Sequence, residues 1–271
     1  CYYDYLQCLR RSVNNLLPDS KELYFHYYWF TRDDTKLANR RLSLLLENTQ
    51  QEIAEKRRPD NLSLPEILFK GKINYVNSFH DCAMICDQII QEVEKHEDDI
   101  VPIGFDLEWP FSFQTGSGKT ALAQICLTKS VCHLLYLYSI DKLPAAFVIL
   151  LAHPKVRLVG VNIKNDIRKL GRDFKNFPAT KIVENNCIDC GTFANKVLNR
   201  SARWSLEALT AYLVKKKINK NPEVRKSKWH IQPLSEAQKI YAATDAYVLV
   251  QERSLKLKTE NIETMLSVKE I

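Results

Sequence analysis

Acidic residues in three separate parts of the 271-residue chain have types and spacings that could support chemistry. The first two, Asp106 and Glu108, stand two residues apart in an apolar run, and alternate residues of a strand point to the same face. Neighbouring carboxylates repel each other unless a cation lies between them. The pair therefore indicates a cation site, although two solvated acids at an exposed strand end would show the same pattern.

The other acidic positions lie far along the chain. Asp166 follows a predicted strand at 157–161 and would stand in the first turn of a helix, where an acid also satisfies free backbone N–H groups. Tyr241 and Asp245 are four residues apart, which places both side chains on one face of a predicted helix. They could equally form a pair facing water. Small neighbours leave room for another group to approach this face: Ala242, Ala243 and Ala246.

In this order, a D-x-E on a strand, a later Asp and a Y-x-x-x-D on a late helix resemble the three motifs of the DEDDy group of DnaQ-like 3′→5′ exonucleases. Within that group, the similarity is greatest to the Werner syndrome exonuclease domain. It is carried by segments 104–110, 204–206, 227–229 and 241–247, and it extends over about 70–257.

Two positions depart from the family pattern. Asn165 precedes Asp166 where these enzymes often have an aromatic residue, and Arg168 stands where some Werner relatives have Trp. Neither position is a metal ligand, so these departures bear on substrate preference rather than on activity.

The resemblance implies two divalent ions, Mg²⁺ or Mn²⁺, both of which favour hard oxygen ligands. Asp106 would bridge the two ions, Glu108 and Asp245 would complete one, and Asp166 would hold the other. Tyr241 would orient the attacking water. These five residues are the predicted catalytic set.

The implied activity is release of 5′-mononucleotides from the 3′ end of DNA, whether single-stranded or at a 3′ terminus, in repair or replication. A nuclear setting and a helicase partner acting in trans are further expectations from the resemblance. An RNase D-type exoribonuclease is the alternative within the enzymes, because no residue identifies a contact to a 2′-hydroxyl group. The alternative outside the enzymes is an inactive nucleic-acid-binding module on the same fold.

The chain is basic, with 39 Lys and Arg against 32 Asp and Glu and a pI near 8.9, which is compatible with a polyanionic partner. Basic residues, among them Lys220, gather ahead of the last predicted helix. We interpret this segment as a nucleic-acid contact, in which phosphates are neutralised and a base stacks on an exposed tryptophan. A solvated loop is the alternative. The predicted contacts are Lys215, Lys216, Lys217, Arg225, Lys226, Lys228 and Trp229.

Hydrophobic periodicity predicts strands and helices in an order typical of an α/β protein. The expected strands lie near 73–76, 100–109, 121–127, 131–138 and 157–161. The expected helices lie near 35–55, 81–95, 143–152, 165–174, 189–198, 205–214 and 235–257. Together with the resemblance, this order predicts an RNase H-like fold whose mixed five-stranded sheet is flanked by helices. We divide the chain into an N-terminal extension (1–65), an exonuclease domain (66–258) and a C-terminal tail (259–271).

Other features point away from rival functions. The eight cysteines have no disulfide spacing, and we expect reduced thiols. Segment 116–120 resembles the end of a P-loop, but Phe113 occupies the place of the first glycine, so a hairpin loop is the better interpretation. No run of about 18 apolar residues is present, so we expect no membrane span.

Overall fold

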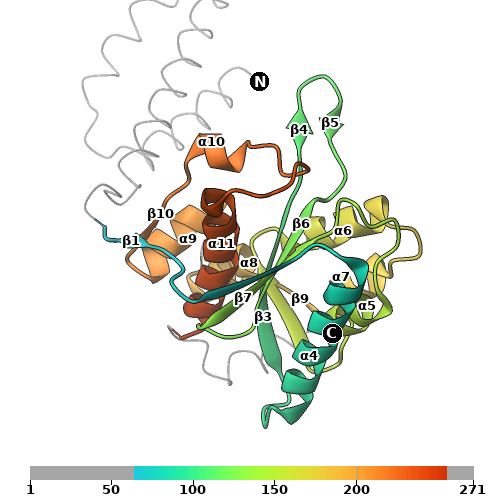
Figure 1. Cartoon of the computed structure of the whole chain (residues 1–271). Helices are drawn as coiled ribbons and strands as arrows, with labels where there is room; N and C mark the ends of the chain where they lie inside the picture. Colours follow the sequence, from blue (N-terminus) through green and yellow to red (C-terminus); the bar gives the residue numbers. More distant parts are fainter. Residues whose placement is uncertain (1–63, 200, 255–271) are drawn as a thin grey trace, which may run out of the picture. The chain divides into compact units, whose positions relative to one another are not determined.

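The computed structural model describes residues 64–199 and 201–254. Figure 1 shows the strands and helices of this part along the chain. The strands are β1 (Glu66–Ile67), β2 (Lys72–Val76), β3 (Val101–Glu108), β4 (Phe111–Ser112), β5 (Gly116–Ser117), β6 (Leu122–Cys126), β7 (Val131–Tyr136), β8 (Val156–Gly160), β9 (Cys187–Asp189) and β10 (Lys217–Ile218). The helices are α4 (Phe79–Lys95), α5 (Ala145–Leu151), α6 (Ile163–Asp173), α7 (Ala179–Asn185), α8 (Cys190–Val197), α9 (Leu206–Leu213), α10 (Pro222–Arg225) and α11 (Glu236–Ser254). The helix expected at 35–55 and the tail from 259 lie outside the described residues.

Six strands form one mixed sheet in the order β2-β7-β6-β3-β8-β9. Strand β6 runs antiparallel to both of its neighbours, whereas the other pairs are parallel. The predicted α/β class with a mixed sheet is confirmed, but the sheet has one strand more than the expected five. The additional strand is β9, an edge strand of three residues, which is too short to show an alternating pattern in the sequence.

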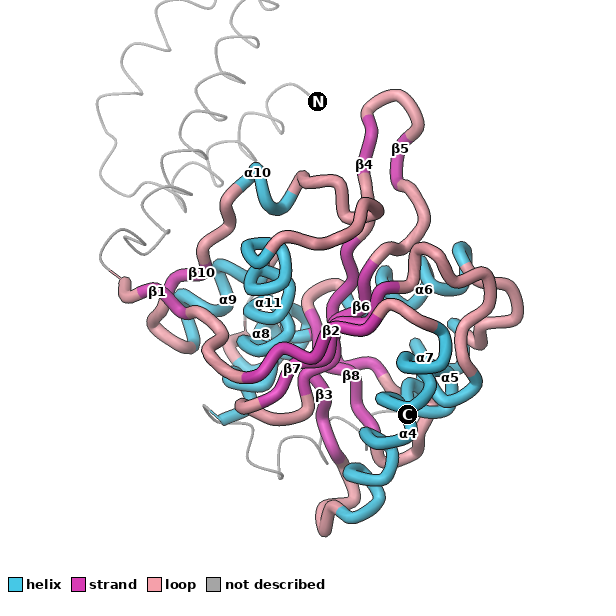
Figure 2. The backbone as a smooth tube through the Cα atoms, in the orientation of Figure 1, coloured by secondary structure: helices cyan, strands magenta, loops and turns pink. Residues whose placement is uncertain are grey.

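Helices cover the sheet on both sides. Figure 2 shows α9 and α11 on one side and α4, α5, α6 and α7 on the other. Strand β3 lies between β6 and β8 in the sheet. Its successive side chains point alternately toward the helices on one side of the sheet and toward those on the other. Its apolar side chains at 101, 103, 105 and 107 belong to the core shared with α4 to α7. The opposite face of β3, which includes Gly104, meets α11.

The longest helix on the α4–α7 side shows why these segments fold as they do. The Ser78 side chain caps α4 by accepting a hydrogen bond from the Asp81 backbone N–H at 3.0 Å. The predicted stripe of Ile85, Ile89 and Val93 is buried against the sheet, which confirms the expected amphipathic pattern.

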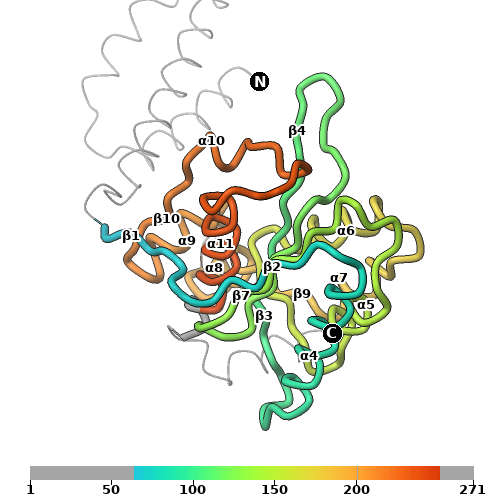
Figure 3. Tube along the Cα trace, in the orientation of Figure 1, coloured from blue at the N-terminus to red at the C-terminus, as the bar shows by residue number. Residues whose placement is uncertain are grey.

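Two short strand pairs lie outside the main sheet. Figure 3 shows β1, near the start of the described chain, beside β10 from its last third, and the two strands pair in parallel. Strands β4 and β5 form a small hairpin within the connection between the antiparallel strands β3 and β6. Segment 116–120 comprises β5 and the residues that lead into β6, so it lies in a hairpin connection between two strands, as expected. None of the helices in the described ranges is both long and apolar enough to cross a membrane.

Candidate active site

Strand β3 presents two carboxylates on the face that meets α11. Asp106 and Glu108 are partly exposed, whereas Leu107 between them is buried in the opposite layer with 3% of its surface exposed. The Leu107 backbone N–H donates a 2.9 Å hydrogen bond to Asp106 Oδ1. The strand period of two, predicted from the sequence, therefore places both acids on the same side.

Helix α11 supplies the third acid because it approaches β3 very closely. A Cβ atom added to Gly104 would lie 2.2 Å from the carbonyl oxygen of Ala246, so only glycine fits at this crossing. This contact places the neighbouring residue, Asp245, next to β3, where it is almost fully buried. Carboxylate oxygens of Asp106, Glu108 and Asp245 all lie within 4.8 Å of one another.

Burial and mutual repulsion disfavour the charged forms of these acids. Burial and the Asp245 charge raise the pKa of Asp106 to about 7, although the Lys220 charge and the hydrogen bond from the Leu107 backbone oppose this effect. Burial and the charges of Asp106 and Asp245 raise the pKa of Glu108 well above its usual range. Burial also raises the pKa of Asp245, although Lys220 opposes this effect. A cation is therefore needed to hold all three acids ionised together.

In this structure, Lys220 supplies positive charge to the group. Its Nζ donates to both carboxylate oxygens of Asp245, at 2.7 and 2.6 Å, and to the Tyr241 hydroxyl at 3.3 Å. The same ammonium lies 4.9 Å from the centre of the Tyr241 ring. Tyr241 and Asp245 thus share one partner, as expected for residues four apart on a helix.

Lys220 was not among the residues predicted for the site. In the sequence it belongs to a run of lysines with nothing to distinguish it, because its role depends on a fold-back from β10 to α11. No local signal identifies it.

The second motif contributes Asp166 from the first turn of α6. The helix begins after Asn162, whose φ of 58° lies in the left-handed region and whose backbone N–H donates to Asp189 Oδ2 at 2.6 Å. Asp166 is 8% exposed, and burial together with the charge of Asp106 raises its pKa to about 9. Asp166 therefore lies within electrostatic reach of Asp106 but outside the close group of three acids.

These residues fit a hard divalent cation better than any other resident group. The donors are carboxylate oxygens, which Mg²⁺ and Mn²⁺ favour, and no histidine or cysteine belongs to the close group. The raised pKa values show that the protein alone does not compensate the acid charges. Asp106, Glu108 and Asp245 could hold an ion between them, and Asp166 could contribute to a second beside Asp106.

The predicted nucleic-acid contacts differ in how exposed they are. Lys215, Lys216, Lys226 and Lys228 are exposed, and Lys217 is partly buried in β10.

Arg225, at the end of α10, is the member of this predicted set whose charge reaches the acids. Its positive charge lowers the pKa of Glu108, Tyr241 and Asp245.

Trp229 corrects one of these predictions. Its ring is 0% exposed, packs within the core formed with Tyr241 and other residues of α11, and donates from Nε1 to the Arg225 carbonyl at 3.1 Å. An enclosed indole has no free face on which a base could stack, so Trp229 is a packing residue. The lysines around Trp229 in the sequence indicated an exposed tryptophan, but in the folded chain its side chain is buried in the core.

The P-loop interpretation of segment 116–120 finds no support in its contacts. Lys119 Nζ donates to the carbonyl oxygens of Tyr138 and Ile140, at 3.1 and 2.7 Å. Thr120 donates from its backbone N–H and its hydroxyl to Asp173. The side chains that would bind a nucleotide phosphate in a P-loop therefore form hydrogen bonds within the protein instead.

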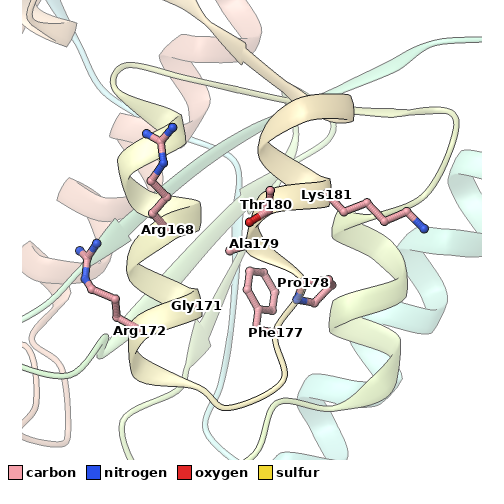
Figure 4. Close-up of a pocket in the computed structure, with 8 residues that line it drawn as sticks. All are labelled: Arg168, Gly171, Arg172, Phe177, Pro178, Ala179, Thr180 and Lys181. Carbon is pink, nitrogen blue, oxygen red and sulfur yellow. The ribbon is translucent and has the colours of Figure 1, made fainter.

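A groove between α6 and α7 lies apart from the acid group. Figure 4 shows its lining residues, none of which is acidic. They are Arg168, Gly171, Arg172, Phe177, Pro178, Ala179, Thr180 and Lys181.

Residues 79–260 match a family model described as 3'-5' exonuclease. A Drosophila melanogaster protein of the same description is 47% identical over 213 residues, which cover 76% of this chain and 60% of that protein. The Drosophila virilis relative is 42% identical over 240 residues, covering 84% of this chain and 72% of the relative. The chain spans about 59% of the length of the relatives from Drosophila sechellia and Drosophila simulans.

Solved structures share the fold. The catalytic core of RRP6 from Trypanosoma brucei (mutant C496S) aligns with a TM-score of 0.54 and 22% identity, over 76% of this chain and 52% of that chain. Trypanosoma brucei RNase D in complex with RNA U12 aligns with a TM-score of 0.56 and 15% identity, over 70% and 63% of the two chains. With the family match, these alignments confirm the predicted RNase H-like fold.

Proposed function

The chain belongs to the 3′–5′ exonuclease family, and on that premise we propose that it removes nucleotides from the 3′ end of DNA by metal-dependent hydrolysis. The observation that carries this proposal is the convergence of Asp106, Glu108 and Asp245 within 4.8 Å. These acids come from a strand and from a helix more than a hundred residues later in the chain. Bringing them together costs free energy through burial and mutual repulsion, and a bound cation would offset that cost. The products would be a 5′-mononucleotide and a shortened strand.

The proposed mechanism is of the two-metal, DEDDy type. Asp106 would hold both ions, Glu108 and Asp245 one of them, and Asp166 the other. When bound, the ions would supply charge to activate the attacking water and to stabilise the leaving 3′ oxygen.

The protein residues have separate tasks in this mechanism. Burial and the Asp245 charge raise the pKa of Tyr241, so its phenol stays protonated and can orient a water by hydrogen bonding. Lys220 donates hydrogen bonds to both carboxylate oxygens of Asp245 in the present structure, so its ammonium group would have to move away from Asp245 when an ion binds there.

We propose DNA as the substrate on the basis of the sequence resemblance to the Werner syndrome exonuclease domain. The same resemblance supports a role in repair or replication, a nuclear location and a helicase partner in trans. RNA is the second candidate, because a protein with this fold, the Trypanosoma brucei RNase D, has been solved with RNA U12.

A time course with matched 5′-labelled DNA and RNA strands, with and without Mg²⁺ or Mn²⁺, tests the proposal. We expect a ladder that shortens from the 3′ end, requires the metal and forms faster on DNA. A faster ladder on RNA would favour the exoribonuclease, and binding of either strand without cleavage would favour the inactive module.

Substitution of the acids tests the assignment of the site. Asp106→Asn or Glu108→Gln should reduce cleavage by more than about 100-fold, since loss of a residue that only supports a metal ligand already costs ~10- to 100-fold. Asp87→Asn, at an exposed acid on α4, is the matched control and should cleave normally. Robust cleavage by Asp106→Asn with an unchanged Tm would refute the assignment.

A further inference from the structure

Helix α6 has two chemically different faces. Asp166, Ile167 and Leu170 lie on the buried face, which turns toward the sheet and the acid group. The outer face carries three exposed cations at intervals of four residues: Lys164, Arg168 and Arg172. At a rise of 1.5 Å per residue, successive cations are about 6 Å apart along the helix. The row therefore leads away from the site that Asp166 borders.

The cations of this row are not used to hold the fold together. Within residues 64–199 and 201–254, neither Arg168 nor Arg172 forms an ion pair, and the closest polar contact of Arg168 is a 3.4 Å approach to Asn165 Oδ1. By contrast, Lys169 on the buried face pairs with Asp173 at 3.0 Å and donates to the Gly118 carbonyl at 2.6 Å. The outer cations are thus available to an external anion.

Helix α7 adds a second wall beside this row. Its start lies so close to α6 that a Cβ atom on Gly171 would be 2.7 Å from the Ala179 Cβ. Figure 4 shows the Phe177 ring between the two helices, with the Arg168 and Arg172 side chains directed outward from α6 and the Lys181 side chain directed outward from α7, so the cations flank the groove on its two sides. The groove has a volume of about 540 Å³, which is enough for a phosphate with its sugar.

We propose that the α6–α7 groove and its row of cations bind the phosphodiester backbone of the same nucleic acid whose 3′ end enters the acid group. This inference rests on the proposed function and extends it by adding a second contact site. Guanidinium groups suit phosphate because they donate two parallel hydrogen bonds and remain charged at every relevant pH. A strand held along α6 would be retained while its end is cut.

The chemistry of the groove favours a polyanion over a small apolar ligand. Small-molecule sites are mostly apolar with few polar groups, whereas three of the eight lining residues here are cations. An acidic polypeptide would match the charge, but only a nucleic acid is also the proposed substrate of the acid group from which this row of cations leads away.

The test compares two double variants of equal charge change, both in an Asp106→Asn background that prevents cleavage. Arg168→Gln/Arg172→Gln removes the row. Lys95→Gln/Lys129→Gln removes two exposed lysines at the end of the sheet where β3 begins, opposite its acids. Fluorescence anisotropy measures binding of a long labelled strand and of a labelled dinucleotide over a series of salt concentrations, and Tm confirms folding.

We expect the arginine variant to bind the long strand about 10-fold or more weakly, with a salt slope that is smaller by about 1.4 to 1.8, as for two lost phosphate contacts. The lysine variant should bind normally, and the dinucleotide should bind all variants alike. Lys181→Gln, on the other helix, should weaken long-strand binding by itself.

Equal affinities of the two double variants for the long strand would overturn the inference, as would tighter binding of poly-glutamate than of nucleic acid. Failure of the proposed function is recognised separately. In that case the wild-type protein does not cleave, whatever the arginine variant binds.

Discussion

The closest approach between the two acid-bearing elements gives the sharpest prediction. Gly104→Ala would place a methyl carbon 2.2 Å from the Ala246 carbonyl oxygen and 3.1 Å from Val250 Cγ2. Because the oxygen belongs to the helix backbone, α11 itself must withdraw by about 1 Å to reach an ordinary contact. Asp245 precedes Ala246, so its carboxylate would move away from Asp106 and Glu108 by a similar amount.

The expected effect is large on catalysis and moderate on stability. A misplacement of about 1 Å can reduce turnover by ~100-fold. Overpacking of this kind costs about 1–3 kcal/mol, which lowers the Tm by several degrees in a domain of this size. Metal-dependent cleavage of a 5′-labelled strand, measured well below the Tm of the variant, separates the two effects.

Gly71→Ala is the matched control. A Cβ atom there would lie 2.4 Å from the Ser130 carbonyl oxygen, in the turn between β6 and β7 and away from the acid end of β3. It should lower the Tm to a similar degree but leave turnover near the wild-type value. Wild-type turnover in Gly104→Ala, or an equal loss in Gly71→Ala, would show that the β3–α11 contact does not set the site geometry.

Three further results are expected. Lys220→Gln should lower the Tm of the metal-free protein and enlarge the rise in Tm caused by Mn²⁺, because the acids lose their present counter-charge; an unchanged Mn²⁺ response in a thermal melt would contradict this. The pKa of Asp106 is raised from 3.8 to about 7 and that of Asp166 from 3.8 to about 9, so the folded protein binds protons that the unfolded chain releases. The free energy of unfolding without metal should therefore fall as pH rises from about 4 to 9, and excess Mn²⁺ should counter the fall, as denaturant titrations would reveal. Lys119→Ala should lower the Tm through loss of its two carbonyl contacts, and no ATP hydrolysis should be detectable before or after the change.

Much of the arrangement of the candidate site was predictable because it depends on local periodicity. The D-x-E pair needs only the alternation of a strand, and the Tyr241–Asp245 pair needs only the helical repeat. The small residues around Asp245 also predicted a close neighbour, which proved to be Gly104. Helix α4 and its buried stripe followed from the same kind of pattern.

The order of acids along the chain, their spacing within each element and the α/β alternation were thus determined by the sequence alone. The tertiary structure decided how these parts meet: that α11 crosses β3 at a glycine, that Lys220 folds back onto Asp245, that Trp229 enters the core and that β9 extends the sheet. The reason is physical. Periodicity is a property of neighbouring residues, whereas these contacts join segments tens or hundreds of residues apart, and their formation depends on the packing of the whole domain.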